Sequence, residues 1–496
     1  MIKKLQFFIL ILLISVTTQA QNWTQIGADI DGESAGDNSG YSVDLNADGS
    51  VLAIGAISNN DSFYAAGQVR IYENLSGTWV QIGEDINGTA SDDGFGYSVS
   101  LSSDGTVVAI GAPYNDDIAV NSGQVRIYEN IEGTWTQIGE AIGGEAIYDQ
   151  SGKSISLSSD GTIITIGARY NDGNGEDSGH VRIYENQSGT WTQVGADIDG
   201  EFAEDYFGIS VSINGDGSIV AVGAMGSDTN GEDSGHVRIY KNILGTWTQI
   251  GSSILGEASF DMSGTTISLS LDGAVVAIGS YWNDGAGFSA GHVRIYKNES
   301  DEWLQVGEDI DGEAEGDWSG YSVCLNSNGS VVAIGAVRNQ ASGEYAGHVR
   351  TYQNQSDTWI QIGEDIDAEA AGDMFGVSVS LNFDGDVLAI GASANDGNGS
   401  AAGHVQVYGN EYLGVESLAQ KGVSIYPNPT NGEIYFEFEN NTIQQITVSD
   451  TNGKQIIKKS ILKQTEMIDL SRFENGVYII NIQTEDEILL TKIVKE

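Results

Sequence analysis

Apolar and polar positions alternate in short segments along most of the chain, and no segment shows a convincing helical period. One unit, residues 96–139, contains four such segments: YSVSLS, TVVAIGAP, GQVRIYE and TWTQIG. The second is a continuous apolar run, typical of a strand buried on both faces, and the other three alternate as half-buried strands do. The pattern predicts four β-strands in each unit and an all-β protein.

The unit recurs with a constant period. Seven of the nine tryptophans lie 56 residues apart: Trp23, Trp79, Trp135, Trp191, Trp247, Trp303 and Trp359. Repeated four-stranded units are the signature of a β-propeller. First strands begin near Ser42, Ser98, Ser154, Ser210, Thr266, Ser322 and Ser378. We therefore predict a seven-bladed β-propeller over residues 21–408.

The last unit stops at Tyr408 without a WTQIG segment of its own, whereas residues 23–27 carry that segment ahead of the first complete unit. We expect this N-terminal strand to complete the seventh blade and close the ring, which leaves no blade open between the two ends.

All five histidines share one repeated position: His180, His236, His292, His348 and His404. Gln68 and Gln124 occupy it in the first two units. A histidine metal centre needs different positions that converge, so a single repeated position favours a structural role at the start of a strand. Cys324 replaces a serine on a strand predicted to be buried, where a thiol is usually inert.

The segment FGYSVSLSSDGTVVAIGAP at 95–113 resembles the FG-GAP repeat of integrin-α-type propellers. The Phe-Gly pair recurs at 207–208 and 375–376, and the other four units carry Ser-Gly. That family binds calcium through a DxDxDG loop between the first two strands. Here the connection is only NADG, SSDG, NGDG or similar, so the resemblance implies the propeller fold and not calcium at this turn.

The composition changes after Tyr408. We expect a linker at 409–423, and residues 424–496 again show alternating segments, which predict a small Ig-like β-sandwich. SIYPNPTNGEIYFEF at 424–438, DTNGK at 450–454 and the final GVYIINIQTEDEILLTKIVKE resemble the type A C-terminal sorting domain of the type IX secretion system. The resemblance implies that secretion machinery as a partner and export across a Gram-negative outer membrane of the Bacteroidetes kind. The alternative is an ordinary accessory module.

Residues 1–20 predict a secretory signal peptide. Lys3 and Lys4 precede an apolar run at 5–16 that ends in small and polar residues. This run is too short to span a bilayer core of roughly 30 Å as a helix, and no later segment approaches eighteen apolar residues. We expect a mature protein that is secreted or displayed on the cell surface and has no transmembrane segment.

The chain has 70 acidic and 21 basic residues, and such a surface would repel nucleic acid. The acids concentrate in two kinds of connection. Residues 28–40 and their six equivalents hold 29, and residues 57–67 and their equivalents hold 12. In a propeller both kinds emerge on one face, which should be strongly negative. This face is either a solvated coat or a binding surface for divalent cations or cationic ligands.

One acid recurs without exception: Asp37, Asp93, Asp149, Asp205, Asp261, Asp317 and Asp373. Each precedes a first strand, which lines the channel of a propeller. A carboxylate here either accepts backbone N–H groups to shape its loop or joins a ring of seven around the channel mouth. Identical use in every unit favours the structural role.

Oxygen-bearing residues alternate in DGNGED at 172–177 and DTNGED at 228–233. Because calcium prefers six to eight oxygen ligands from a flexible loop, these residues are candidate calcium ligands. The candidates are Asp172, Asn174, Glu176, Asp228, Asn230 and Glu232. The full twelve-residue calcium loop is absent, and the alternative is an ordinary turn.

The sequence contains no Gly-x-Ser-x-Gly, His-Glu-x-x-His or phosphate-loop motif. We therefore predict a non-enzymatic binding or adhesion propeller for an extracellular glycan or protein ligand. A polysaccharide hydrolase or lyase, whose paired groups are set only in space, and a structural surface-layer protein are the alternatives.

Overall fold

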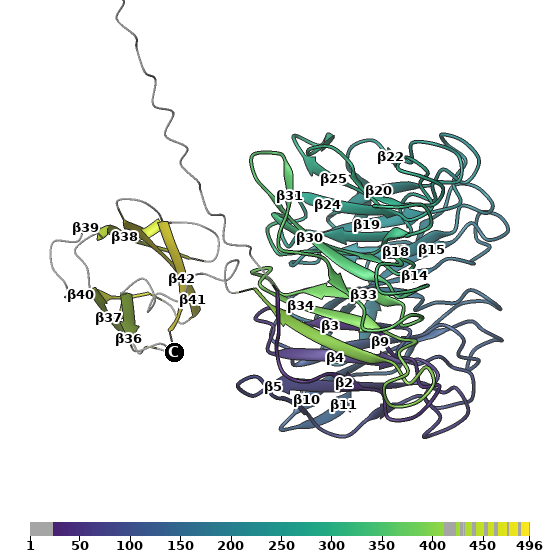
Figure 1. The fold of residues 1–496 in the computed structure, drawn as a ribbon, viewed down its shortest axis with the longest axis horizontal. Coiled ribbons are helices and arrows are strands. Elements are labelled where there is room, and N and C mark those ends of the chain that lie inside the picture. Colours follow the sequence, from purple (N-terminus) through teal and green to yellow (C-terminus); the bar gives the residue numbers. More distant parts are fainter. Residues whose placement is uncertain are drawn as a thin grey trace, which may run out of the picture.

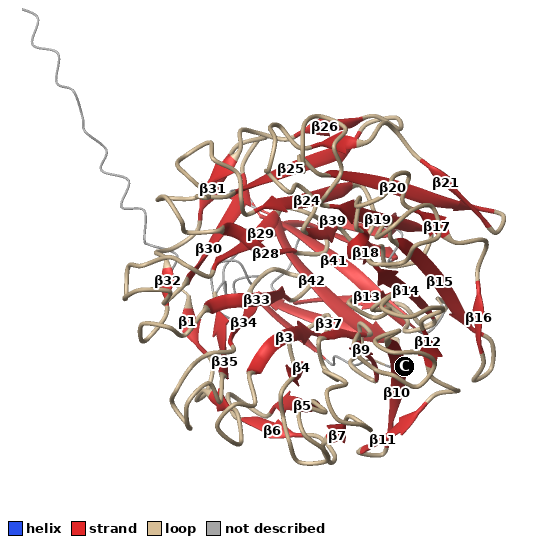
Figure 2. Cartoon of the chain, turned by 90° about the vertical axis from the view of Figure 1, so that its right-hand side faces the viewer, coloured by secondary structure: helices blue, strands red, loops and turns tan. Residues whose placement is uncertain are grey.

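The computed structural model describes residues 23–410 and, toward the C-terminus, 423–426, 430, 432–438, 443–450, 455–460, 465–473, 476–484 and 488–495. Every regular element in these residues is a β-strand (Figure 2). The described part of the chain contains no apolar helix of membrane-spanning length. The predicted signal peptide at 1–20 and most of the predicted linker at 409–423 lie outside the described residues.

Seven antiparallel sheets surround one axis, and each has the same strand order from the channel outward (Figure 2). This confirms the predicted all-β, seven-bladed propeller. The innermost strands are β3 (Ser39–Leu45), β8 (Ser98–Leu101), β13 (Ser154–Leu157), β18 (Phe207–Ile213), β23 (Thr266–Leu269), β28 (Ser319–Leu325) and β33 (Phe375–Leu381). The second strands are β4 (Val51–Ala56), β9 (Val107–Ala112), β14 (Ile163–Ala168), β19 (Ile219–Ala224), β24 (Val275–Ser280), β29 (Val331–Ala336) and β34 (Val387–Ala392).

The third strands are β5 (Gln68–Asn74), β10 (Gln124–Ile131), β15 (His180–Asn186), β20 (His236–Ile243), β25 (His292–Asn298), β30 (His348–Asn354) and β35 (His404–Gly409). The outermost strands are β6 (Trp79–Gln81), β11 (Thr134–Gln137), β16 (Trp191–Gln193), β21 (Thr246–Gln249), β26 (Trp303–Gln305), β31 (Trp359–Gln361) and β1 (Thr24–Gln25). Each continues, after a bulge, as a short strand on the same third strand: β7 (Ile86–Asn87), β12 (Ile142–Gly143), β17 (Ile198–Asp199), β22 (Ile254–Leu255), β27 (Ile310–Asp311), β32 (Ile366–Asp367) and β2 (Ile30–Asp31).

The core consists of hydrophobic layers between neighbouring blades. Val69 and Ile71 of β5, for example, pack with Val108 and Ile110 of β9. Second strands approach the next blade so closely that a Cβ atom on Gly55 would collide with the Gly96 carbonyl oxygen. This explains the repeated Gly-Ala ending of these strands, because only glycine leaves room for the neighbouring backbone.

The seventh blade takes its outer strand from the N-terminal end. β1 pairs with β35, with Thr24 opposite Gly409, and β2 pairs with the same strand, with Ile30 opposite Val405. The Trp79 indole N–H donates to the Ile26 carbonyl of the neighbouring outer strand at 3.1 Å, and five later tryptophans repeat this bond. Trp23 donates instead to Thr351 Oγ1 at 2.8 Å.

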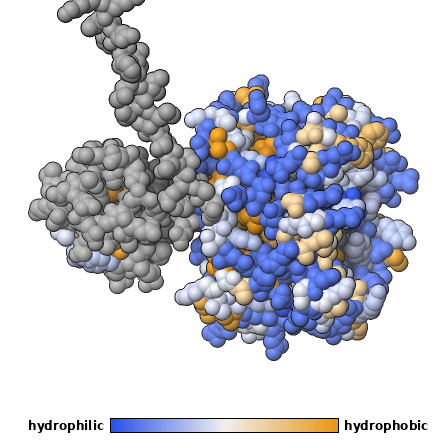
Figure 3. All heavy atoms as spheres, in the orientation of Figure 1, coloured by the Kyte–Doolittle hydropathy of each residue, from blue (hydrophilic) through white to orange (hydrophobic). Residues whose placement is uncertain are grey.

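The long connections gather on the face at the right of Figure 1, which Figure 2 presents to the viewer. Connections of neighbouring blades are joined on this face by backbone hydrogen bonds, such as Phe95 N–H to the Ala66 carbonyl at 2.9 Å. The side view in Figure 3 is largely hydrophilic with scattered apolar patches.

The C-terminal region forms two sheets. One contains β36 (Val423–Tyr426), β37 (Glu433–Phe438) and β40 (Thr465–Asp469), and the other β38 (Ile443–Asp450), β39 (Gln455–Ser460), β41 (Gly476–Thr484) and β42 (Ile488–Lys495). Phe436, Ile446, Ile468 and Ile480 belong to a single core shared by both sheets, as in a β-sandwich.

Candidate functional site

One end of the central channel is surrounded by main-chain hydrogen bonds between the blades, and we call it the closed end because these bonds form an unbroken ring. The turn after each innermost strand donates an N–H to the carbonyl of the next turn, and the seven bonds measure 2.8–3.1 Å. They link Ala47, Ser103, Ser159, Gly215, Leu271, Ser327 and Phe383 in a complete circle. Because every turn has the same two partners, this end is uniform around the axis.

Inside this closed end lies a cavity of about 180 Å³. Around it, one side chain of each blade, usually a serine, accepts the backbone N–H of the next blade, as Ser100 does from Leu157 at 3.1 Å. Asp44 and Cys324 replace two of the seven serines and accept the equivalent bonds. Burial raises the pKa of Asp44 to about 6 and that of the Cys324 thiol to about 12. The partly buried thiol is therefore protonated at neutral pH.

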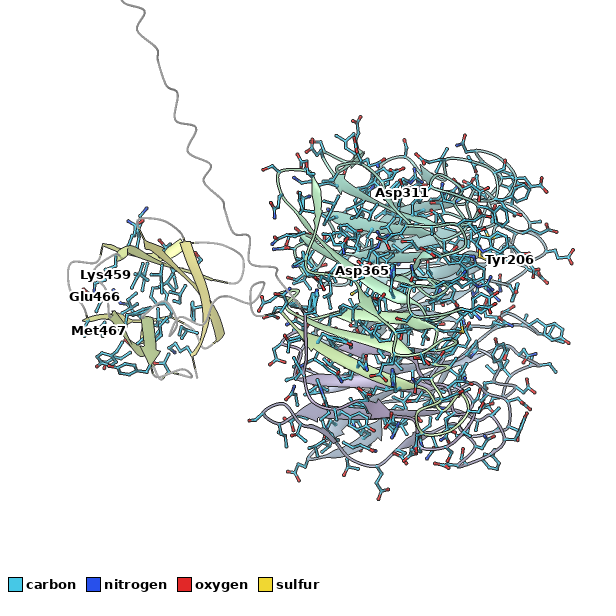
Figure 4. All side chains as sticks on the ribbon, viewed as in Figure 1. Tyr206, Asp311, Asp365, Lys459, Glu466 and Met467 are labelled. Carbon is cyan, nitrogen blue, oxygen red and sulfur yellow. The ribbon has the colours of Figure 1, made fainter. Side chains whose placement is uncertain are left out.

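The opposite end of the channel, where the innermost strands begin, carries aromatic and cationic side chains that we call the aromatic mouth. They come from the first six blades, and most are partly exposed. Tyr206, labelled in Figure 4, lies on this face. The members are Tyr41, Tyr97, Tyr114, Lys153, Arg169, Tyr170, Tyr206, Tyr281, Trp282, Trp318, Tyr321, Arg338 and Tyr345.

Tyrosines of neighbouring blades contact each other at the mouth of the channel. The Tyr41 and Tyr97 rings lie 4.9 Å apart, and the Tyr41 hydroxyl donates to that of Tyr97 at 2.8 Å. Burial, followed by the neighbouring phenols Tyr97 and Tyr321, raises the pKa of Tyr41 far above its usual value. Because Tyr321 belongs to the sixth blade and Tyr97 to the second, phenols of separate blades lie close enough to influence one another's ionisation.

Three cations lie on these rings. Lys153 Nζ is 3.8 Å from the centre of the Tyr97 ring, and Arg338 Cζ is 3.3 Å from that of Trp318. Arg169 lies over Tyr170, whose hydroxyl accepts from Nη2 at 2.9 Å, and its buried Nε has no hydrogen-bond partner. Burial, followed by repulsion from Arg169, lowers the pKa of Lys153 to about 7.

None of these three cations forms an ion pair with a carboxylate within the described residues. The six arginines of the third strands do the opposite, since each approaches an acidic side chain at 2.6–3.9 Å. The mouth therefore holds positive charge that the protein does not neutralise, on the face where most of its acids lie.

The seven repeated aspartates lie beneath this surface and are at most 3% exposed. Each accepts a backbone N–H of its own loop, as Asp93 does from Ala90 at 2.9 Å. Asp37, Asp149, Asp205, Asp261, Asp317 and Asp373 repeat this bond. Their carboxylates hydrogen-bond the backbone of their own loops and are not exposed at the mouth.

The two candidate calcium loops have the same local structure as loops that lack the full pattern. Asp172 accepts the Asp177 N–H at 2.9 Å and Asp228 that of Asp233, and Asp284 and Asp396 form equivalent bonds. Asn174 and Asn230 donate their amides to Gly200 and Gly256 at 2.8 Å, whereas Glu176 and Glu232 are exposed. Calcium at these loops stays a prediction.

The structure brings the repeated histidines close to acids. A glutamate and an aspartate have ligand atoms within 4.8 Å of the histidine nitrogen and of each other in four blades. These groups are Glu145–His180–Asp197, Glu257–His292–Asp309, Glu313–His348–Asp365 and Glu369–His404–Asp29. One repeated sequence position therefore does converge with other positions in space.

Sequence reasoning missed both the aromatic mouth and these histidine groups. A signal for the mouth was available, because its residues are the ones that break the repeat. Lys153 occupies the position that Tyr41, Tyr97 and Tyr321 have in other repeats. At the position of Arg169, other repeats carry different residues, such as Met225.

Residues 424–496 match the family of secretion system C-terminal sorting domains, and residues 87–128, 197–240 and 367–408 each match the FG-GAP repeat. The search among curated proteins found no match.

Similar solved structures include Kuenenia stuttgartiensis hydrazine synthase, at 13% identity and a TM-score of 0.47 over 75% of this chain and 95% of that one. A putative 6-phosphogluconolactonase from Bacteroides uniformis has 12% identity and a TM-score of 0.47 over 66% and 85%. Chaetomium thermophilum Raptor has 11% identity and a TM-score of 0.48, and the match covers 79% of this chain and 29% of that one. These low values carry no argument about function.

The sevenfold architecture and the two family matches lead to one conclusion. The chain is a seven-bladed β-propeller that contains FG-GAP repeats and ends in a secretion system C-terminal sorting domain, a tail that indicates export through the type IX secretion system to the cell surface or the extracellular space.

Proposed function

We propose that this exported propeller is a non-enzymatic binding or adhesion protein, and that its aromatic mouth binds a glycan with carboxylate or sulfate groups. The observation that supports this most is the set of basic side chains Lys153, Arg169 and Arg338, none of which forms an ion pair within the described residues, in a chain with 70 acidic and 21 basic residues. Charge-assisted hydrogen bonds from such cations are among the stronger polar contacts available to an anion.

The aromatic residues supply the apolar surface that a glycan site needs beside its charged groups. Exposed Trp282 and partly exposed Trp318 stack at 6.0 Å, and Tyr321 stacks on Trp318 at 6.3 Å, which presents broad ring surface. Binding sites for small ligands combine such apolar faces with a few placed polar groups. Acids of this face that lie more than about 8 Å from a bound anion repel it only weakly, because that is the Debye length at physiological ionic strength.

The test is a binding titration of the mature chain against a uronate polysaccharide, a sulfated polysaccharide and neutral dextran. Saturable binding to an acidic glycan and none to dextran is expected. Lys153→Thr and Arg169→Met introduce residues that other blades carry at these positions, Thr265 and Met225. Each should weaken binding roughly 10- to 100-fold, because a hydrogen bond to a charged group contributes about 1.5–3 kcal/mol.

Lys241→Gln is the matched control, since it removes a lysine from the outer end of a third strand and introduces the residue found at Gln353. It should bind as the wild type does. Equal binding by all the variants, or equal binding to dextran, would contradict the proposed site.

One observation favours a second candidate, a polysaccharide lyase. Lys153, whose pKa is about 7, lies beside Tyr97 and Tyr114 and near Arg169. In a uronate, neutral Lys153 would remove the proton next to the carboxyl group while Arg169 pairs with the carboxylate. A carbon–carbon double bond would form as the bond to the glycosidic oxygen breaks, and a tyrosine hydroxyl would protonate that oxygen.

The same titration separates the two candidates. A lyase would produce an ultraviolet-absorbing unsaturated sugar, and Lys153→Thr would abolish its formation. Saturable binding with no such product supports the adhesion role.

A further inference from the structure

We propose that the closure of the ring binds a divalent transition-metal ion, such as Zn²⁺, between Asp29, Glu369 and His404. Asp29 lies in the bulge between β1 and β2, and His404 begins β35, so the two residues come from the two ends of the propeller sequence. Each of the three side chains offers one ligand atom, and these atoms lie within 4.8 Å of one another.

The histidine is buried and faces the carboxylates. The His404 side chain is only 2% exposed, and its Nδ1 lies 3.9 Å from Asp29 Oδ2, too far for a hydrogen bond. An ion between this nitrogen and the two carboxylates would bind all three side chains at once.

The donor set suits zinc. One imidazole nitrogen and two carboxylate oxygens are a combination that Zn²⁺ binds at about 2.0–2.2 Å, with a fourth position left open. Glu369 is exposed and Asp29 is partly exposed, so both carboxylates can close on an ion without repacking the core.

The other three histidine groups contain a competing cation. Arg182, Arg294 and Arg350 lie two residues after their histidines, and each approaches the glutamate of its group at 3.4–3.6 Å. Asp365 of the sixth-blade group is labelled in Figure 4. A fixed guanidinium occupies one carboxylate and repels a divalent cation, so these groups are poor metal sites.

The seventh blade differs at this position. Gln406 replaces the arginine, and its amide donates to Asp29 Oδ1 at 3.0 Å and to Glu369 Oε1 at 3.2 Å. The amide oxygen accepts from the Tyr408 hydroxyl at 2.7 Å. The two carboxylates are thus held together by a neutral group, and their charge is left for a cation. An ion here would also join the strands that close the ring.

The test is a titration of chelator-treated mature chain with Co²⁺, which has visible absorption bands that report its ligands, and with Zn²⁺ as competitor. The wild type should bind one equivalent. Gln406→Arg introduces the residue that six blades carry, and His404→Gln the residue at Gln68 and Gln124. Each should weaken binding at least tenfold, and circular dichroism should show both folded.

His180→Gln is the matched control, because it removes a histidine from a group that contains Arg182, and it should bind Co²⁺ as the wild type does. A wild type without saturable binding would overturn the proposal. Equal binding by wild type, Gln406→Arg and His404→Gln would also overturn it, since the ion would then lie elsewhere. If one variant fails to fold, the other decides.

Discussion

The two ends of the channel are built by opposite rules. At the closed end all seven turns form the same backbone bond, and five of the seven side chains around the cavity are serines. At the aromatic mouth no two neighbouring blades present the same set of residues, and tyrosine, tryptophan, lysine and arginine stand at equivalent positions. The comparison shows that residues repeated in every blade stabilise the fold, whereas residues that differ between blades form the candidate sites.

The same rule holds farther from the axis. Six blades carry an arginine on the third strand and the seventh carries Gln406, at the place where the proposed metal site lies. In a repeat protein the residue that differs is therefore more informative about function than the residue that recurs.

The largest effect should come from breaking the ring itself. Deletion of residues 23–31 removes β1 and β2, exposes the edge of β35 and removes the Trp23 bond to Thr351. A loss of well over 5 kcal/mol is expected, because several apolar side chains and backbone bonds of one blade are lost together. Thermal unfolding measures it, and an unchanged midpoint would contradict the closure.

A smaller change should make the closed end more uniform. Asp44→Ser restores the serine of the other blades, which can accept the Leu101 N–H that Asp44 Oδ2 accepts at 2.7 Å. The pKa of Asp44 is about 6 in the folded protein and near 3.9 when unfolded, so ionisation destabilises the fold progressively between these values. The variant should gain up to about 3 kcal/mol at pH 8 and nothing at pH 3.5. Equal gains at both pH values would contradict this account.

At the aromatic mouth, the stability gained by replacing Lys153 should decrease as the pH rises, the opposite of the dependence expected for Asp44→Ser. Lys153 has a folded pKa of about 7 against about 10.4 when unfolded, so its charge destabilises the fold fully below pH 7 and less as the pH rises. Lys153→Thr should therefore stabilise the protein at pH 6 by about 1–2 kcal/mol, because the side chain keeps some contact with solvent, and less at pH 9.5. Melting curves at both pH values measure it. A gain that grows with pH would show that the lysine is not buried as a cation.

The smallest effect is expected from calcium. If the loops at Asp172 and Asp228 are ordinary turns, calcium, magnesium and sodium chloride at equal ionic strength should give the same melting temperature. A rise specific to calcium would establish binding to the folded state, and Asp172→Asn combined with Asp228→Asn should then remove it.

Much of the architecture follows from the residues alone. The 56-residue spacing of the tryptophans predicted seven blades, and the alternation within each unit predicted its four strands, because a two-residue period places every second side chain on one face of a sheet. The short strand after each bulge was not predicted, since two residues such as Ile86 and Asn87 carry too little pattern. The C-terminal motifs indicated the export route for the same local reason, because they are contiguous in sequence.

What the sequence could not determine is which distant residues meet. Lys153, Arg169 and Tyr321 converge only because seven blades curve around one axis, and Asp29 reaches His404 only because the first strand pairs with the last blade. Repeats at equal spacing predict equivalent places in a ring, but the contacts across its channel and across its closure depend on the curvature and twist accumulated over every blade. The sequence by itself determined the fold and indicated the export route. The tertiary structure alone decided where charge, aromatic surface and the histidine–carboxylate groups come together, because those groups consist of side chains brought close by long-range packing.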